Sequence, residues 1–401
     1  MRTEEKPDIC ITCSTWAITI LFSSQYISTV LGIYLGSGDY FSLVMSAGVV
    51  LGIIPLMFKR DVFEVRKDFF LLILLVLFYY FGTFFLYPGR TNVSIVDFIG
   101  MCLVPCFFGG MLQPHYKQVL KNTMYLMCFS LPVINLLFAK GNGIYSSYDA
   151  ITMGTSYAVL PVIMAGIVHF VFFRNESSRI EKVFYLISFI YTFYFITMSY
   201  RGALVALFVT IFFSWYFTSE RKNKSNAIII VSILGILGII VWYNFNTIIV
   251  WLSNVLDSLN IKIALIDKTL SLTETSGLMH GRIDIYKAAI TGFLEKPIFG
   301  HGVASFKYFT GIEFPHNFIL EFLYDGGLIL TSIILMLLIS GLKRVNFITR
   351  TDSEDKFAFI VLIASISLTR TMVSAEVWRV ILFWMLMGII TNNRQLESFE
   401  S

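Results

Sequence analysis

The sequence predicts an all-α, polytopic membrane protein of about twelve transmembrane helices with one long extracytoplasmic loop that contains an amphipathic helix. Hydrophobic residues make up 56% of the chain, charged residues only 14%, and mean hydropathy is +0.75. Water-soluble domains rarely have this composition. Apolar runs of about 20 residues, the length that crosses a hydrocarbon core about 30 Å thick, recur along the chain. Residues 244–315 form the one long stretch that is neither such a run nor a short turn.

The apolar runs divide the chain into three parts. The candidate spans are 14–35, 39–58, 68–87, 95–112, 119–139, 151–173, 182–199, 201–218, 226–243, 316–340, 356–373 and 376–392. We therefore expect an N-terminal bundle of about nine helices (1–243), an extracytoplasmic loop (244–315) and about three C-terminal helices (316–401). The first run is too long for the core of a signal peptide, so we expect it to stay in the mature protein.

Basic residues in the short loops predict the orientation of these helices, because cytoplasmic loops collect Lys and Arg. Five alternate loops do so, and they hold Lys59, Arg60, Arg66 and Lys67; Lys117 and Lys121; Arg174, Arg179 and Lys182; Arg221, Lys222 and Lys224; and Lys343, Arg344, Arg350 and Lys356. The short loops between them carry only Arg90, Lys140, Arg201, Arg370 and Arg379. We therefore expect both termini in the cytoplasm and residues 244–315 outside it. The net charge of +4 then reflects topology, and it does not indicate nucleic-acid binding.

Cysteines and acidic residues give no sign of a metal or cofactor. The five cysteines lie in expected spans or on the cytoplasmic side, which predicts no disulfide framework. Cys10 and Cys13 have the spacing of half a zinc site or a redox motif, but no second pair follows. No Asp-x-Asp motif occurs in an outward-facing segment, so a divalent metal clamp is not indicated. We interpret the cysteines as reduced and structural.

Three segments of the outer surface carry candidate site residues, and the first is the tight turn Ser199-Tyr200-Arg201-Gly202. It places Arg201 at the start of a helix, where backbone donors and the helix dipole favour anions. Gly202 permits close approach of a ligand to the backbone. The turn is compatible with a phosphate site, and the alternative is an arginine that reaches lipid headgroups.

The second segment is Gly281-Arg282 with the residues that follow. Tyr286, Ala289, Ile290, Phe293 and Leu294 recur with helical spacing and predict an amphipathic helix over 282–295, ended by Pro297. Arg282 falls in its first turn, near the membrane interface. A guanidinium there can grip a diphosphate with two parallel hydrogen bonds, although a plain surface arginine would give the same pattern.

The third segment is Glu313-Phe314-Pro315-His316-Asn317. Pro315 stops any preceding helix, so His316 is expected at the mouth of the bundle where the next span starts. A lone histidine is more often a satisfied polar group than a catalyst, but this position favours function. Glu321 and Asp325 lie four residues apart on one helical face, and we expect one of them to bond to neighbouring helices or to substrate. A purely structural role for a buried carboxylate is the alternative.

The order of these motifs resembles the O-antigen ligase/polymerase superfamily of bacterial polytopic glycosyltransferases. The resemblance covers about residues 195–340 and comprises Ser-x-Arg-Gly at 199–202, Gly281-Arg282 with its amphipathic helix, Gly300-His301-Gly302, and His316-Asn317 followed by Gly326-Gly327. It implies a donor glycan on undecaprenyl diphosphate, with Arg201 and Arg282 at the diphosphate and His316 at the acceptor hydroxyl or the phosphates. His301 occupies a variable position of the family motif and is left outside the catalytic set.

The resemblance implies an enzyme of the bacterial inner membrane whose active site faces the periplasm. We expect no cofactor and no metal; the expected partners are the lipid-linked oligosaccharide, the bilayer, a chain-length regulator and a flippase, and nucleic acid is not among them. Catalysis is assigned to His316, Arg201 and Arg282. Secondary substrate-binding candidates are Asn317, Glu321, Arg90 and Arg370.

The polymerase branch of the superfamily is favoured over the ligase branch. The ligase pattern keeps Gly-x-x-Gly after His-Asn and has a longer stretch before the histidine, whereas Leu328 follows Gly326-Gly327 here. A lipid-linked oligosaccharide flippase or other carrier is a further alternative, but it predicts two related halves and a charged central cavity. A scaffold protein of the envelope would need no arrangement of Arg and His at one surface.

Overall fold

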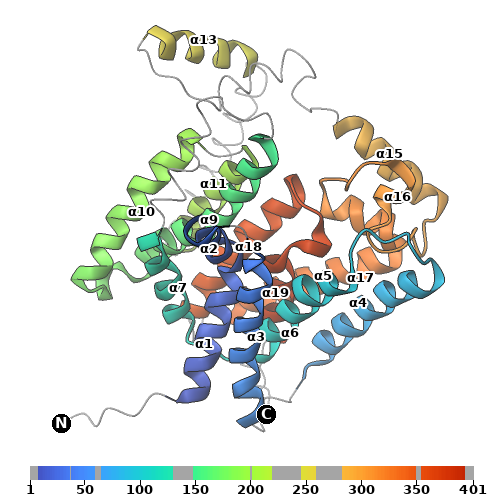
Figure 1. Cartoon of the computed structure of the whole chain (residues 1–401), viewed down its shortest axis with the longest axis horizontal. Coiled ribbons are helices and arrows are strands. Elements are labelled where there is room, and N and C mark those ends of the chain that lie inside the picture. Colours follow the sequence, from blue (N-terminus) through green and yellow to red (C-terminus); the bar gives the residue numbers. More distant parts are fainter. Residues whose placement is uncertain are drawn as a thin grey trace.

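A computed structural model of the chain describes residues 8–36, 38–58, 65–129, 148–198, 201–218, 245–258, 282–348 and 354–392. Within these ranges the regular elements are all helical, which confirms the all-α class and a multi-pass membrane protein. Figure 1 shows most of the helices gathered in a bundle, with α15 and α16 at one side of it. The predicted division at residues 243 and 315 stays a prediction.

The described helices fall, in chain order, into two parts. The first part comprises α1 (Ile9–Phe22), α2 (Ser24–Leu35), α3 (Tyr40–Phe58), α4 (Lys67–Leu86), α5 (Ile95–Asp97), a π-helical turn (Phe98–Leu103), α6 (Val104–Met111), α7 (Tyr116–Tyr125), α9 (Tyr148–Phe173), α10 (Arg179–Met198) and α11 (Arg201–Thr218). The second part comprises α13 (Phe245–Ser258), α15 (Arg282–Glu295), α16 (Phe306–Thr310), α17 (Phe318–Ile348), α18 (Glu354–Val373), a 3-10 turn (Val377–Arg379) and α19 (Ile381–Thr391).

Twelve spans are not confirmed. Within the described ranges, five helices are long and apolar enough to cross a membrane, or six if α1 and α2 form one span bent by 70°. The predicted span 95–112 is one apolar helix, Ile95–Met111, with a π-helical segment inside it, and it is shorter than these spans. The predicted span 376–392 reduces to α19, which begins at Ile381. The predicted span 226–243 and residues 130–139 lie outside the described residues. His316 lies outside the long helices because α17 begins at Phe318, and Glu376 does because α18 ends at Val373.

The core is built around α19, whose residues are all buried. It crosses α6 closely, and a Cβ at Gly388 would lie 2.0 Å from the Cys106 carbonyl oxygen. Small residues let membrane helices approach until their backbones touch. Trp378 and Trp384 stack at 5.3 Å above this crossing. The crossing fixes the turn between α18 and α19, where residues of the site lie.

The predicted amphipathic helix is confirmed as α15 (Arg282–Glu295), although the face that it buries differs from the expected one. Ala289 and Gly292 are buried, but Ile290 and Leu294 are 46% and 67% exposed. A Cβ at Gly292 would lie 2.2 Å from the Tyr324 ring of α17. Close packing on α17 selects the small residues, and the larger apolar residues point away from the bundle.

The segment 297–302 packs against a break in α17 at Gly327. The Gly327 backbone adopts φ +61° and ψ −158°. Leu328 therefore donates its N–H to the Pro297 carbonyl at 2.8 Å, and Ile329 donates to the Ile298 carbonyl at 3.4 Å. A Cβ at Gly327 would lie 2.5 Å from the Ile298 carbonyl, so the close approach requires glycine.

The carbonyls freed by this break are also satisfied by neighbours. Tyr324 accepts from the His301 N–H at 2.9 Å, and Asp325 accepts from the Gly302 N–H at 2.8 Å. The Tyr79 hydroxyl donates to the Gly326 carbonyl at 3.1 Å. Backbone groups at membrane depth need such protein partners, because lipid offers none. The Gly-x-Gly and Gly-Gly motifs thus hold the segment 297–302 against α17.

Candidate active site

The end of α18 is the point at which the sequence-predicted residues meet. A Cβ at Gly202, in the first turn of α11, would lie 2.5 Å from Ser374 Oγ and 2.4 Å from the Tyr157 hydroxyl. Tyr157 in turn donates to Ser374 Oγ at 2.9 Å. Glycine at position 202 therefore lets the N-terminus of α11 touch the residue that follows α18. Arg201 is the first residue of α11, and its side chain lies outside the described part.

Arg282 reaches the same helix end from α15. Its Nη2 donates to the Val373 carbonyl at 2.8 Å, and Val373 is the last residue of α18. A free carbonyl at a helix C-terminus is a natural partner for a cation. Among the described residues no carboxylate pairs with Arg282. Its remaining donors are therefore available to an anionic ligand.

His316 lies close enough to Arg282 for the guanidinium charge to act on it. Burial, and secondarily the Arg282 charge, lower the pKa of His316 to about 4, so the imidazole is neutral at pH 7. Its backbone has φ +57°, a left-handed conformation that is unusual for a residue with a side chain. Its ring packs against Phe314 at 4.4 Å. Nδ1 is buried without a hydrogen-bond partner in the described structure, a feature that is common at functional sites.

Asn317 and Glu321 have structural partners. Asn317 Oδ1 accepts from the N–H groups of Ile319 and Leu320 at 3.0 and 3.2 Å and caps the start of α17. Both carboxylate oxygens of Glu321 lie 3.1 Å from the Val377 N–H, and Glu321 is 1% exposed. These contacts attach the start of α17 to the turn before α19. They hold the His316 segment in place, and binding of substrate by either residue stays a prediction.

Asp325 is also tied to neighbouring segments. Its Oδ2 accepts from the Ala304 N–H at 2.9 Å and from Trp378 Nε1 at 2.7 Å. Ala304 has φ +51°, so the carboxylate holds a strained turn. Asp325 therefore bonds to neighbouring segments, and a role toward substrate stays a prediction.

Arg370 lies one turn before the end of α18. Its guanidinium donates to Gln25 Oε1 at 2.7 Å and sits 4.9 Å from the centre of the Tyr157 ring, while Nε is buried without a partner in the described residues. A cavity of about 10 Å³, room for about one water molecule, lies beside it. Because Tyr157 bonds to Ser374, Arg370 belongs to the group of residues around the end of α18.

Arg90 is placed elsewhere. Its guanidinium stacks on Tyr87 at 4.4 Å and lies 5.4 Å from Phe309 and 5.9 Å from Tyr308. These rings belong to the end of α4 and to α16, and not to the contacts around α18. The structure thus joins Arg282, His316 and Arg370 with the start of α11, and it sets Arg90 apart.

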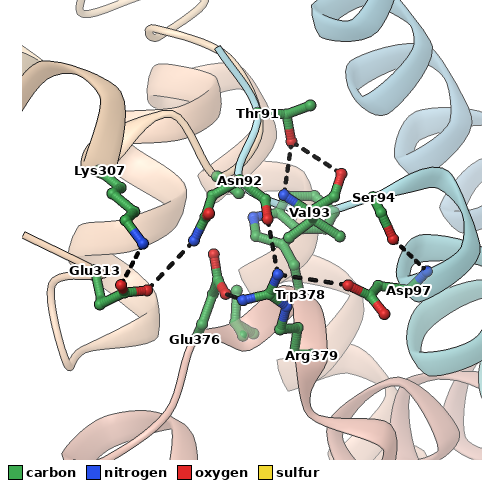
Figure 2. A network of polar contacts seen from close by, with 12 residues as sticks. Thr91, Asn92, Val93, Ser94, Asp97, Lys307, Glu313, Glu376, Trp378 and Arg379 are labelled. Atoms are coloured by element: carbon green, nitrogen blue, oxygen red, sulfur yellow. Dashed lines mark hydrogen bonds and ion pairs between the residues drawn. The ribbon is translucent and has the colours of Figure 1, made fainter. Parts of the chain in front are cut away.

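Arg379 organises a network that the sequence does not predict (Figure 2). It donates to Glu376 at 3.0 Å and to the Asn92 carbonyl at 2.7 Å, and it lies 3.4 Å from Asp97. Burial raises the pKa of Glu376 to about 7, and the Arg379 charge opposes this rise. In the sequence, Arg379 stands out only as one of the few basic residues expected in outer loops. The sequence does not indicate a role for Glu376, because the burial of its carboxylate depends on the fold.

The same network reaches the segment before His316. Asn92 Nδ2 donates to Glu313 at 3.4 Å, and Glu313 forms an ion pair with Lys307 (Figure 2). The Asn92 N–H donates to the Ala304 carbonyl at 3.0 Å. These bonds therefore join the loop after α4, the segment 302–315 and the turn before α19 to one another.

His301 has a local structural role. Its Nε2 lies 2.8 Å from the Gly292 carbonyl, and its ring stacks on Tyr324 at 4.6 Å. It is 4% exposed. These contacts fasten the end of α15 to α17, which agrees with leaving His301 outside the catalytic set.

Comparison with known families adds the deciding observation. Residues 184–335 match the family model described as O-Antigen ligase. The chain carries a domain of the O-antigen ligase/polymerase superfamily. This confirms the resemblance seen in the sequence motifs and supports glycosyltransferase activity, but it does not distinguish the polymerase branch from the ligase branch. No curated protein matches the chain.

The O-antigen ligase family domain contains only part of the site. Arg201, Arg282 and His316 lie within residues 184–335, and so does the broken start of α17. Arg370 and the Glu376–Arg379 turn lie beyond it, and Arg90 precedes it. The helix end that receives Arg282 is therefore supplied by a part of the chain outside the matched domain.

Proposed function

We propose that the protein is an O-antigen polymerase, which transfers a glycan from undecaprenyl diphosphate to the non-reducing end of a lipid-linked repeat unit. The observation that supports it most is the meeting of Arg282, His316 and the first turn of α11 around the end of α18, within and beside an O-antigen ligase family domain. Cations, a helix N-terminus and a neutral imidazole suit a diphosphate leaving group and a hydroxyl acceptor.

The proposed reaction needs charge neutralisation, orientation and one proton acceptor. The acceptor hydroxyl oxygen forms a bond to the anomeric carbon, and its proton passes to His316. The bond from that carbon to the diphosphate oxygen breaks, and the electron pair leaves with the diphosphate. Arg201 and Arg282 stabilise the charge that develops there, in the role that a divalent metal has in other glycosyltransferases.

The neutral state of His316 supports its assignment as a base. With its pKa lowered to about 4, the imidazole can accept a proton at pH 7. Burial and, secondarily, the nearby Arg282 disfavour imidazolium in the free enzyme, and a bound diphosphate offsets the contribution of Arg282. Substrate binding would then raise the pKa of His316 toward the pH at which proton transfer is efficient.

The polymerase reaction is favoured over the ligase reaction by the short segment before His316. Between Gly302 and Pro315 the chain has room for α16 and little else, which leaves few residues to hold a bulky lipid A core. The distinguishing experiment is deletion of the gene. A polymerase deletion leaves cells decorated with one repeat unit, which is the result that we expect. Bare core with long glycans on undecaprenyl diphosphate would show a ligase instead.

The proposal requires the site to face the periplasm, with both termini in the cytoplasm of a bacterium and the protein in its inner membrane. A reporter fused at Asn260 should then behave as extracytoplasmic and one at Asn223 as cytoplasmic. Reversed reporters would remove the proposed mechanism. In this setting a flippase delivers the lipid-linked unit and a chain-length regulator acts beside the polymerase.

A further inference from the structure

A second cationic surface lies at the other end of α15 and does not belong to the site around α18. Arg90 stacks on Tyr87 at 4.4 Å, and Lys296 lies 5.7 Å from the centre of the same ring. Two cations thus share one aromatic ring, although they come from segments about 200 residues apart in the sequence. We call Tyr87, Arg90, Lys296, Tyr308 and Phe309 the Tyr87 surface.

The Tyr87 surface has aromatic and apolar surroundings that are exposed. Tyr308 is 60% and Phe309 45% exposed, and both belong to α16. Phe85 and Leu86, in the last turn of α4, are 72% and 73% exposed. Figure 1 shows α15 and α16 beside the end of α4. Exposed apolar residues at the end of a membrane helix, with aromatic rings and cations next to them, are typical of the lipid–water interface.

The cations of this surface are not neutralised by the protein. Within the described ranges, neither Arg90 nor Lys296 has an ion pair with a carboxylate. Lys307, which starts from the same helix as Tyr308, is by contrast paired with Glu313. The nearest acidic neighbour in sequence is Glu295, which is directed to His301 at 3.8 Å. Contacts with one ring hold the two cations in place but leave their charge available.

The helix α15 separates this surface from the candidate active site. Arg282 is its first residue, and Lys296 follows its last. At 1.5 Å per residue the fourteen residues of α15 span about 21 Å. A single lipid diphosphate is far too short to bridge that distance. The two ends of α15 therefore suit two different anionic lipids.

We propose that the Tyr87 surface binds the diphosphate of a second polyprenyl lipid, the one that carries the acceptor glycan. This inference rests on the proposed polymerase function, in which both substrates are linked to polyprenyl diphosphate. Arg282 and its neighbours hold the donor, and Arg90 and Lys296 hold the acceptor lipid at the interface. The polyprenyl chain lies against the exposed end of α4, and the glycan extends along α15 toward His316.

The number of lipids bound tests the inference. The full-length protein in phosphatidylcholine nanodiscs is titrated with undecaprenyl diphosphate, and bound lipid is counted by native mass spectrometry. We expect two equivalents for the wild type and one for Arg90→Gln/Lys296→Gln. Each cation near a lipid phosphate contributes about fivefold in affinity, so each single variant should weaken the second equivalent by about that factor. Arg282→Gln should lose the other equivalent.

Lys287→Gln is the matched control, because it removes an exposed cation from the same helix without touching either end. It should bind two equivalents. A double variant that still binds two equivalents would overturn the inference. The same titration is repeated with phosphatidylglycerol. If the double variant loses phosphatidylglycerol to the same extent as undecaprenyl diphosphate, the surface holds bulk anionic lipid and the inference is overturned. One equivalent in the wild type, lost only in Arg282→Gln, would also overturn it while the donor site stands. A wild type that binds none would contradict the proposed function itself.

Discussion

The two ends of the helical bundle treat their half-buried cations differently. At the end formed by the starts of α4, α7, α10 and α18, Lys117 pairs with Glu176, Lys121 with Glu181 at 2.7 Å, and Arg344 with Asp68. At the other end Arg379 is likewise paired, with Glu376 and Asp97. Arg282 and Arg370, however, contact carbonyl and amide oxygens and an aromatic ring there, and in the described chain neither is paired with a carboxylate. Leaving a half-buried cation unpaired costs stability. The second end therefore keeps a charge that the first end neutralises.

The backbones of the two ends differ in the same way. The paired end is made of regular helix starts and the last turns of α17, whereas the other end contains the break at Gly327 and the left-handed backbone of His316 and Ala304. Unusual backbone costs free energy and is found preferentially at functional sites. Charge and geometry thus point to the same end of the molecule.

The largest expected effect concerns the catalytic set. His316→Ala, Arg282→Ala and Arg201→Ala should each lower glycan polymerisation on the order of 10²-fold or more, because each removes a proton acceptor or a stabilising charge. Protein abundance in the membrane should stay near normal. The measurement is the length distribution of surface glycan on gels, with immunoblots for abundance. Normal glycan chain lengths in all three variants would contradict the assignment of these residues to catalysis.

The break in α17 should be next in effect. Gly327→Val forces a side chain into a left-handed backbone and against the Ile298 carbonyl, and it should destabilise the protein by about 3 kcal/mol or more. Gly82→Ala is the control, since a Cβ there meets nothing within 4 Å. Thermal unfolding of the purified protein measures both. Equal melting temperatures for the two variants would contradict the docking of residues 297–302 on the break.

A smaller loss is expected when the clamp on the segment 302–305 is removed. Asp325→Ala leaves the Ala304 N–H and Trp378 Nε1 buried without their acceptor, which should cost about 2 kcal/mol. Glu313→Gln, which weakens an exposed ion pair at the same end, should cost about 0.5 kcal/mol or less. If the two variants unfold at the same temperature, Asp325 does not hold this turn.

A further expected effect is a dependence of stability on pH. The folded-state pKa of His316 is lowered from 6.5 to about 4, so the unfolded chain takes up a proton first as the pH falls. The stability that His316 contributes is present above about pH 6.5 and is lost as the pH falls toward 4. His316→Gln should flatten this part of a melting-temperature profile. An unchanged profile would show that the imidazole is solvated and freely protonated.

Some of this architecture follows from local sequence and some does not. Residues 282–295 are predicted as a helix because apolar spacing starts after Gly281 and Pro297 ends it, and α15 has those bounds. The buried face is not predictable from that spacing, because packing on Tyr324 selects Gly292 and Ala289 over larger residues. The local spacing of apolar residues specifies where a helix forms, and the segment on which that helix packs determines which of its faces is buried.

Long-range partners also limit what the sequence predicts about the site. The motif order around Arg282 and His316 places both at one surface, and the structure brings them together. The sequence near Val373 does not predict that the end of α18 contacts Arg282, because Arg282 lies about 90 residues away. The sequence near Glu376 does not predict its burial either, because the turn that contains it packs on a segment about 280 residues away. Apolar length likewise does not reveal the 70° bend between α1 and α2.

The central claim is that the end of the bundle containing Arg282 keeps a cation unpaired to bind a diphosphate. Its most direct test is the same arginine-to-lysine substitution at each end of the bundle. Lysine keeps the charge but loses the fork of parallel donors that grips a diphosphate. Arg282→Lys should abolish long-chain glycan, whereas Arg344→Lys should leave chain length unchanged because its partner Asp68 needs only a charge. Both are measured as glycan length at matched protein abundance. Wild-type chains in Arg282→Lys, or equal loss in both variants, would contradict the account.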